Sequence, residues 1–178
     1  MEFINSNHFH RIGHFKEEEG ITQKIRRDQS GDEKEKLATA QRKSGSIAFV
    51  EDLADRDYDE ILKGIVYDEI LKDIVYLWVV DEIIIYVGQT GNSFRGRNHL
   101  KHFKDKYEGW IQDGKSVKYS DAIEVMANSE SKQIDVYIKK SGTHDLMGVT
   151  GISLRHTEEE AIKVKFENVD GWLKCNRN

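Results

Sequence analysis

A cluster of basic residues between positions 94 and 118 has the types and spacing to bind a phosphate backbone. This stretch holds seven lysines and arginines against three acidic residues, a net charge of +4 in a chain whose total is -5. At 100° per residue, Arg97, Lys101 and Lys104 fall on one side of a helix, beside an apolar stripe. Phosphate groups are natural partners of such a cationic surface. Charge alone favours a solvated surface helix, so other residues must decide between the two interpretations.

Three strands are expected to support this helix. Residues 74–80 and 83–88 are almost wholly aliphatic or aromatic, and Asp81 and Glu82 between them are typical of a tight turn. Ile134, Val136 and Ile138 alternate with polar residues, which predicts a third strand. The pattern therefore favours a hairpin followed, after the basic helix, by one more strand.

Helices are expected over residues 94–110, over residues 120–127 and from Thr157 onward. In the last of them Ala161, Ile162 and Phe166 should face inward, and Thr157 and Glu160 have the spacing of a capping box. Strands and helices together predict a small α/β domain, with a mainly antiparallel three-stranded sheet flanked by helices.

The folded domain is expected over residues 58–178. Residues 1–57 hold few large apolar side chains, which indicates a polar N-terminal extension that is partly disordered or helical. A tandem duplication follows, because residues 58–66 and 67–75 differ only in Gly64 against Asp73. Nine residues turn a helix by half a revolution, so the two copies cannot bury the same face of one helix. We expect the first copy to be a helix ending near Gly64 and the second to enter a strand by Ile74.

Two tripeptides within the expected hairpin resemble the signature of the GIY-YIG nuclease family. They are Ile74-Val75-Tyr76 and Tyr86-Val87-Gly88, and Arg97 follows on the next helix. Ile74 stands where the family has glycine. Gly64-Ile65-Val66-Tyr67 looks similar, but its tyrosine lies too far from Tyr86 for a tight hairpin. The resemblance covers residues 73–176 and implies a metal-dependent endonuclease that hydrolyses DNA phosphodiester bonds.

The resemblance assigns roles to both tyrosines of the hairpin. Tyr76 would help to deprotonate the attacking water, with Tyr86 as its partner and Gly88 against the nucleic acid. Both tyrosines must then face one side of the sheet. With antiparallel pairing, a two-residue turn would place them on opposite faces, so an odd-length turn or a β-bulge is required.

The resemblance also assigns the basic helix to the phosphate. Arg97 would hold the scissile phosphate through its forked guanidinium, with Arg95 as the competing arginine and Lys104 as a further contact. The family often has a histidine one turn later, where this chain has Lys101. Either Lys101 serves as a cationic contact, or the helix is shifted by one residue and His102 serves.

The metal ligand implied by the resemblance is a glutamate of the last helix. The family's glutamate precedes an Ile-Lys pair by four residues, which selects Glu158 as the ligand of Mg²⁺ or Mn²⁺. Glu159 and Glu160 remain alternatives, and an acidic triplet in a first helical turn also interacts favourably with the helix dipole. Asn176 matches the family's late asparagine, without the proline that usually precedes it.

Composition excludes several classes of protein. The single cysteine, Cys175, rules out an internal disulfide framework and a cysteine-based zinc site. Charged residues make up 33% of the chain, and no apolar run approaches the length of a membrane span. A cytoplasmic protein without a membrane partner is therefore expected. The net charge of -5 argues against a globally basic DNA-coating protein.

The partner expected from the resemblance is double-stranded DNA, and a homodimer is one way for a single site per chain to cut both strands. Two other functions remain open. One is a catalytically inactive nucleic-acid-binding protein of the same fold, favoured by the degenerate first tripeptide and the absent helix histidine. The other is a protein-interaction module with a charged arm, in which the basic surface is incidental. Restriction, homing and repair roles all use the same chemistry.

Overall fold

A computed structural model of the protein describes residues 1–18, 46–51, 72–92, 94, 99, 103 and 117–176. Its elements in chain order are α1 (Glu2–Ser6), β1 (His10–Glu18), β2 (Ser46–Glu51), β3 (Ile74–Val80), β4 (Ile83–Thr90), α5 (Val117–Asn128), β5 (Gln133–Lys140), β6 (Thr143–Leu146), β7 (Val149–Ser153) and α6 (Arg155–Phe166).

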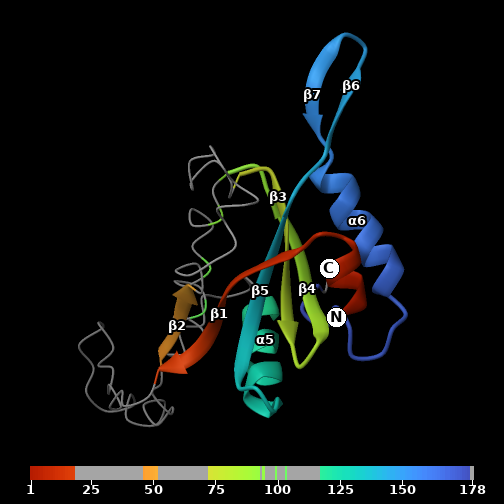
Figure 1. Ribbon diagram of the computed structural model, residues 1–178. Coiled ribbons are helices and arrows are strands. Elements are labelled where there is room, and N and C mark those ends of the chain that lie inside the picture. Colours follow the sequence, from red (N-terminus) through yellow and green to blue (C-terminus); the bar gives the residue numbers. More distant parts are fainter. Residues whose placement is uncertain are drawn as a thin grey trace, which may run out of the picture.

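The main sheet has five antiparallel strands in the order β2-β1-β5-β3-β4 (Figure 1). The expected α/β class and the mainly antiparallel sheet are confirmed. Three of the five strands, β4, β3 and β5, are the hairpin and the strand that the sequence predicts. The expected number of three strands is too small, because β1 and β2 extend the sheet beyond β5.

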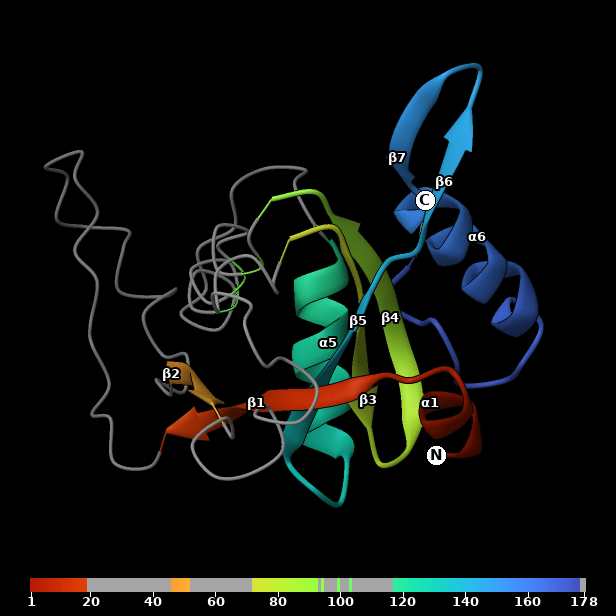
Figure 2. The same cartoon turned by 45° about the horizontal axis from the view of Figure 1, so that its top comes forward.

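Helices cover both faces of the sheet, with α5 on one side and α6 on the other (Figure 2). The side facing α5 holds an aromatic core that includes Tyr76, Trp78 and Phe103. The side facing α6 holds Leu77, Val79 and other apolar residues, against Ile162 and Phe166 of the helix. All seven residues of β3 are buried, because the strand is central and covered on both faces.

The N-terminal residues take part in this fold. Ile4, Phe9, Ile12 and Phe15 are buried, and β1 pairs along β5 from His10↔Ile138 to Lys16↔Gln133. The described parts of residues 1–57 therefore differ from the expected polar extension. The intervals 19–45 and 52–71, which include the first copy of the repeat and most of the second, lie outside the described residues. The second copy does enter β3 at Ile74, as predicted.

Both described C-terminal helices begin earlier than the sequence predicts, α5 at Val117 and α6 at Arg155. Helix α5 contains the expected 120–127 segment. Helix α6 begins at Arg155, with Leu154 as an N-cap that makes no side-chain hydrogen bond, so the predicted capping box of Thr157 and Glu160 is wrong. Ile162 and Phe166 are buried as expected, whereas Ala161 is exposed.

A second, two-stranded sheet was not predicted. Strands β6 and β7 form a hairpin between β5 and α6 that projects beyond the rest of the fold (Figure 1). Its side chains are exposed in β6 and for most of β7, so the segment lacks the alternation of apolar and polar residues that marks a half-buried strand.

Candidate functional site

A β-bulge brings the two motif tyrosines to one face of the sheet. The turn between β3 and β4 has two residues, Asp81 and Glu82, both with positive φ (47° and 68°). Regular pairing from this turn would leave Tyr86 on the face opposite Tyr76. The register instead shifts between Trp78↔Tyr86 and Val79↔Ile84. Tyr86 thus lies opposite Trp78 on the face that also carries Tyr76, and the tyrosine rings are 5.9 Å apart between centroids. The bulge required by the motif is present.

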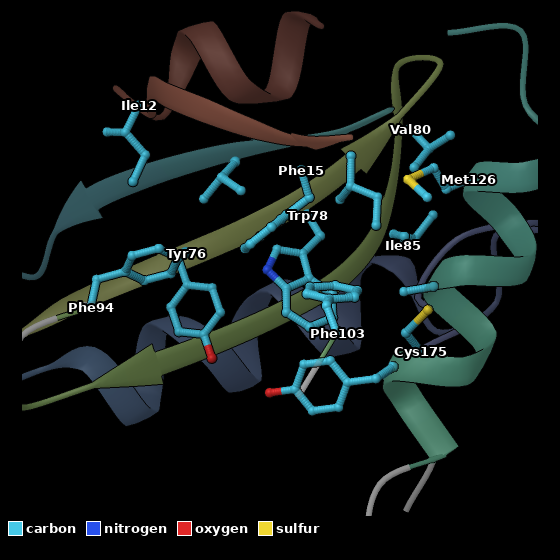
Figure 3. Close-up of a cluster of buried hydrophobic side chains, with 14 of the residues drawn as sticks. Ile12, Phe15, Tyr76, Trp78, Val80, Ile85, Phe94, Phe103, Met126 and Cys175 are labelled. Carbon is cyan, nitrogen blue, oxygen red and sulfur yellow. The ribbon is translucent and has the colours of Figure 1, made fainter. Parts of the chain in front are cut away.

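Tyr76 is packed tightly within the aromatic core. It is 2% exposed, and its ring centroid lies 5.2 Å from those of Phe94 and His99. Figure 3 shows Tyr76 beside Phe94 and Trp78 beside Phe103. Gly88 is paired with Tyr76, and a Cβ atom there would lie 2.6 Å from the hydroxyl oxygen of Tyr76. The glycine of the second tripeptide is therefore required by the tyrosine of the first.

Tyr86 is half-buried and has a cationic neighbour. The Lys118 ammonium donates a hydrogen bond to the Tyr86 hydroxyl oxygen at 3.2 Å. The same Nζ atom lies 4.8 Å from the centroid of the Tyr86 ring and 5.0 Å from that of Tyr119. The sequence indicated Lys118 only as the last member of the basic stretch, because nothing in its spacing connects α5 with β4.

A buried histidine completes this side of the sheet. His99 Nδ1 lies 2.8 Å from the Tyr119 hydroxyl oxygen, and the His99 ring is 5.3 Å from Trp78 between centroids. Of the predicted helix over residues 94–110, only Phe94, His99 and Phe103 are described, and all three are buried. The predicted phosphate contacts lie outside the described residues: Arg95, Arg97, Lys101, His102 and Lys104.

The three glutamates of α6 have different partners. Glu158 Oε1 accepts hydrogen bonds from Lys139 Nζ at 3.1 Å and from the Gly142 amide at 3.3 Å. Glu159 and Glu160 both pair with Lys163, at 3.1 and 2.7 Å. Glu158 is therefore the member of the triplet that binds residues of β5 and its C-terminal end.

Glu158 and the tyrosines occupy different faces of the sheet. Helix α6 packs against the face that carries Leu77 and Val87, whereas Tyr76 and Tyr86 belong to the face covered by α5. The end of β4 contacts the start of α6 on the face that carries Leu77 and Val87, because Gln89 is paired with Val75. Gln89 follows Gly88 directly, and its side-chain oxygen accepts a hydrogen bond from Arg155 Nε at 2.9 Å.

Arg155 fastens the start of α6 to this end of the sheet. Besides the contact with Gln89, its Nη1 donates to Asp73 Oδ1 at 2.9 Å. The guanidinium also lies over Gly91, where a Cβ atom would be 3.2 Å from Arg155 Cζ. Sequence reasoning missed Arg155, because its partners are 66 and 82 positions away along the chain.

Asn176 binds the main chain of β4. Its Oδ1 accepts a hydrogen bond from the Val87 amide and its Nδ2 donates to the Val87 carbonyl, both at 2.7 Å. The amides of Leu173 and Cys175 donate to the carbonyls of Ile84 and Ile85. The predicted late asparagine is thus a positioning residue, which holds the C-terminal segment along the edge of the strand that carries Tyr86.

One carboxylate oxygen of Glu158 has the surroundings that a metal ligand would need. No group of three or more His, Cys, Asp or Glu side chains with a metal-binding arrangement occurs within the described ranges. Glu158 Oε2 is buried and has no hydrogen-bond partner among them. Mg²⁺ commonly binds proteins through one or two carboxylates and keeps several waters, so this oxygen fits such an ion.

Comparison with known proteins returned no match among family models, curated proteins or solved structures. Within the part of the chain that the structure describes, no helix is long and apolar enough to cross a membrane. The function therefore has to be inferred from the residues themselves.

Proposed function

We propose that this protein is a metal-dependent endonuclease that hydrolyses DNA phosphodiester bonds, as its resemblance to GIY-YIG nucleases implies. The observation that carries the proposal is the placement of Tyr76 and Tyr86 side by side through a β-bulge. A bulge disturbs regular pairing, and bulges are over-represented beside active sites, where they re-aim a side chain.

Hydrolysis requires a water molecule to attack phosphorus while the bond to the leaving oxygen breaks, and the water's proton needs an acceptor. Tyr86 is half-buried and Tyr76 is 2% exposed, so Tyr86 is the tyrosine that solvent reaches. Because Tyr76 is buried, the contact with the attacking water that the resemblance gives to Tyr76 falls to Tyr86 in the proposal. The Tyr86 hydroxyl group would bind and orient this water, and the proton released on attack would pass to solvent water. The Tyr76 ring packs beside the Tyr86 ring, in the space left by the missing side chain of Gly88, and so holds the Tyr86 ring in place.

Positive charge beside Tyr86 would bind the phosphate. Lys118 already contacts the Tyr86 hydroxyl group, and an ammonium group at this point can also interact with a phosphate oxygen. Arg97 retains the forked phosphate contact that the resemblance implies. Both residues belong to the basic stretch of residues 94–118, so in the proposal this stretch binds the phosphate.

Glu158 is the residue that would hold Mg²⁺ or Mn²⁺, through the oxygen that has no partner among the described residues. Such an ion, when bound, supplies charge neutralisation at the phosphate and stabilises the leaving oxygen. Lys139 and the Gly142 amide bind the other carboxylate oxygen and so fix the orientation of the side chain. Because Glu158 and the tyrosines belong to opposite faces of the sheet, the proposal requires the substrate to contact both faces at the end of β4.

The proposal is tested by nicking of supercoiled plasmid in Mg²⁺, in Mn²⁺ and in EDTA. The variants Tyr86→Phe, Glu158→Gln and Arg97→Ala should each lose at least 100-fold in rate, the scale typical of a lost acid–base or electrostatic contact. Glu167→Gln is the matched control, because Glu167 is an exposed carboxylate at the C-terminal end of the same helix and outside the glutamate triplet. Absence of metal-dependent nicking by the unmodified protein would refute the endonuclease.

A second candidate function is nucleic-acid binding without cleavage. It is favoured by the ion pair between Glu158 and Lys139, because a carboxylate already neutralised by a lysine attracts a metal ion less strongly. A protein of this kind would bind duplex DNA with steep salt dependence and leave the plasmid intact.

A further inference from the structure

The two carboxylate oxygens of Glu158 have different surroundings. Oε1 accepts hydrogen bonds from Lys139 Nζ at 3.1 Å and from the Gly142 amide at 3.3 Å. The side chains of Glu158 and Lys139 are 21% and 29% exposed, so water screens this ion pair only in part. Oε2 is buried and has no hydrogen-bond partner among the described residues. The carboxylate thus binds a cation of its own chain through one oxygen and offers the other to a ligand.

Lys139 lies at the end of the sheet, on the face that α6 covers. Val75 of β3 is paired with Gln89 of β4 on one side and with Lys139 of β5 on the other. Residues paired across strands share a face, so Gln89 and Lys139 both face the side of α6. Arg155 binds Gln89 there, but its ion-pair partner is Asp73. The charge that acts on Glu158 directly is therefore that of Lys139.

These surroundings oppose the binding of a divalent cation. Lys139 offsets the single negative charge of Glu158, and Glu158 lies in the first turn of α6, where the helix dipole is positive. The part of the chain that the structure describes adds no group of three or more His, Cys, Asp or Glu side chains that could share an ion. An ion on Oε2 would leave an excess of positive charge at a partly buried position, which is unfavourable where the effective dielectric constant is low.

A phosphate group supplies the negative charge that such a site needs. Mg²⁺ is commonly bound by one or two carboxylates together with substrate phosphates, rather than by a cage of protein ligands alone. A phosphodiester oxygen beside Glu158 would offset the charge of the ion and could accept a hydrogen bond from the partly exposed Lys139 ammonium. Metal and phosphate would then each raise the affinity for the other by the same factor.

We propose that Lys139 makes the binding of a divalent ion at Glu158 depend on a bound phosphodiester. Without nucleic acid, the ammonium group neutralises the carboxylate and keeps the metal affinity low. With a phosphate in place, the same carboxylate binds the ion. Lys139 acts through Glu158 and is a positioning residue in this scheme. The inference rests on the proposed function and adds to it the regulation of its metal site.

The test measures Mn²⁺ binding directly, through the electron paramagnetic resonance signal of free Mn²⁺, with and without a short DNA duplex. In the samples with duplex every protein also carries Tyr86→Phe, which suppresses cleavage under the proposed function. Glu158→Gln at the same duplex concentration gives the Mn²⁺ that DNA and other sites bind, and this amount is subtracted.

Three variants of neighbouring lysines separate charge from structure. Lys139→Met removes the ammonium group and keeps a long unbranched side chain. Lys139→Gln also removes the charge but keeps a hydrogen-bond donor, and it replaces Lys139→Met if that variant does not fold. Lys140→Met is the matched control, because Lys140 is the next residue of β5 and its Nζ donates to the Lys72 carbonyl instead.

Without duplex, we expect Lys139→Met to bind Mn²⁺ about tenfold or more tightly than the unmodified protein. Duplex should raise the Mn²⁺ affinity of the unmodified protein by about the same factor and that of Lys139→Met much less. Lys140→Met should behave as the unmodified chain. A gain in affinity separates the proposed role from a merely structural one, because damage to the site would weaken Mn²⁺ binding.

The remaining outcomes decide against the proposal or against the proposed function. Equal or weaker Mn²⁺ binding by both Lys139 variants overturns the role of Lys139, as does an equal gain in Lys140→Met, and plasmid nicking then still tests the endonuclease separately. Mn²⁺ binding that depends on Lys139 and on duplex, without plasmid nicking, supports the inference and refutes the nuclease. If Glu158→Gln binds as much Mn²⁺ as the unmodified protein with and without duplex, Glu158 is not the ligand, and the inference falls together with the metal role given to Glu158.

Discussion

The hydroxyl group of Tyr76 occupies the space where a side chain at Gly88 would begin. The two residues are paired across β3 and β4, and a Cβ atom at Gly88 would lie 2.6 Å from both Cζ and the hydroxyl oxygen of Tyr76. It would also lie 2.8 Å from Cε1 of Tyr86. The absence of a side chain at Gly88 thus makes room for the inward-facing tyrosine of each tripeptide, Tyr76 and Tyr86. This steric requirement explains why a glycine stands two residues after Tyr86.

Replacing Gly88 by alanine should destabilise the fold. The added methyl group would push two aromatic rings out of a close-packed core, at a cost of about 1–3 kcal/mol in the free energy of unfolding. Urea denaturation followed by tryptophan fluorescence measures this cost. Gly142→Ala is the control, because its Cβ atom would meet Leu154 Cδ1 at 3.4 Å, an ordinary contact. Equal midpoints for both variants would contradict the steric role of Gly88.

The sequence was sufficient to predict the centre of the sheet but not its register. Strand β3 is apolar at all seven positions because both faces are covered, so no alternation shows which side Tyr76 faces. From the sequence, the bulge that brings Tyr76 and Tyr86 to one face could be stated only as a requirement of the resemblance, and its position could not be predicted. Ile85, the extra residue, is as apolar as its neighbours and carries no signal of its own.

The parts missed by sequence reasoning have a common physical cause. In β1 the buried Ile12 and Phe15 are separated by Gly13 and His14, which break the regular alternation, and a register shift between Arg11 and Gly13 accompanies them. The hairpin β6–β7 has no buried face at all. Periodicity reports burial on one side, so strands with an irregular or absent buried face escape it.

Asn176→Ala should weaken the attachment of the C-terminal segment to β4. The side-chain amide makes two hydrogen bonds of 2.7 Å with the main chain of Val87, and its removal leaves a partly buried amide and carbonyl without that partner. We expect a loss of about 1–3 kcal/mol in the free energy of unfolding. Asn168→Ala is the control, because Asn168 is exposed and its side chain makes a long hydrogen bond of 3.4 Å to the neighbouring Glu167. A similar midpoint shift in both variants would show that the bonds to Val87 contribute little.

Acid should destabilise the protein partly through His14. Burial, together with the neighbouring Arg11 guanidinium, lowers the pKa of His14 below its ordinary value of 6.5. The folded state therefore favours the neutral imidazole, and the unfolded chain binds the proton first as the pH falls. The resulting stability is fully present above pH 6.5 and is lost progressively as the pH falls toward the lowered pKa.

The variant His14→Gln isolates this effect. Thermal or urea unfolding is compared between pH 7.5 and pH 5 for the variant and for the unmodified protein. The unmodified protein should lose more stability over this interval than the variant, since glutamine does not titrate. Parallel pH profiles would show that the protonation of His14 is not linked to folding.

Arg155→Lys should loosen the start of α6 although it retains the positive charge. The guanidinium binds Gln89 and Asp73 at once, each at 2.9 Å, and an ammonium group lacks the planar fork that reaches both. We expect a loss of about 1–2 kcal/mol in the free energy of unfolding, the scale of two partly exposed hydrogen bonds of which one is an ion pair.

Lys163→Gln is the matched control on the same helix. Lys163 pairs with Glu159 and Glu160, and both pairs lie within α6 and connect it to no strand. If both variants unfold at the same urea concentration, Arg155 does not anchor the helix. If Arg155→Lys alone unfolds earlier and also nicks plasmid more slowly under conditions where it remains folded, the position of Glu158 depends on this anchor.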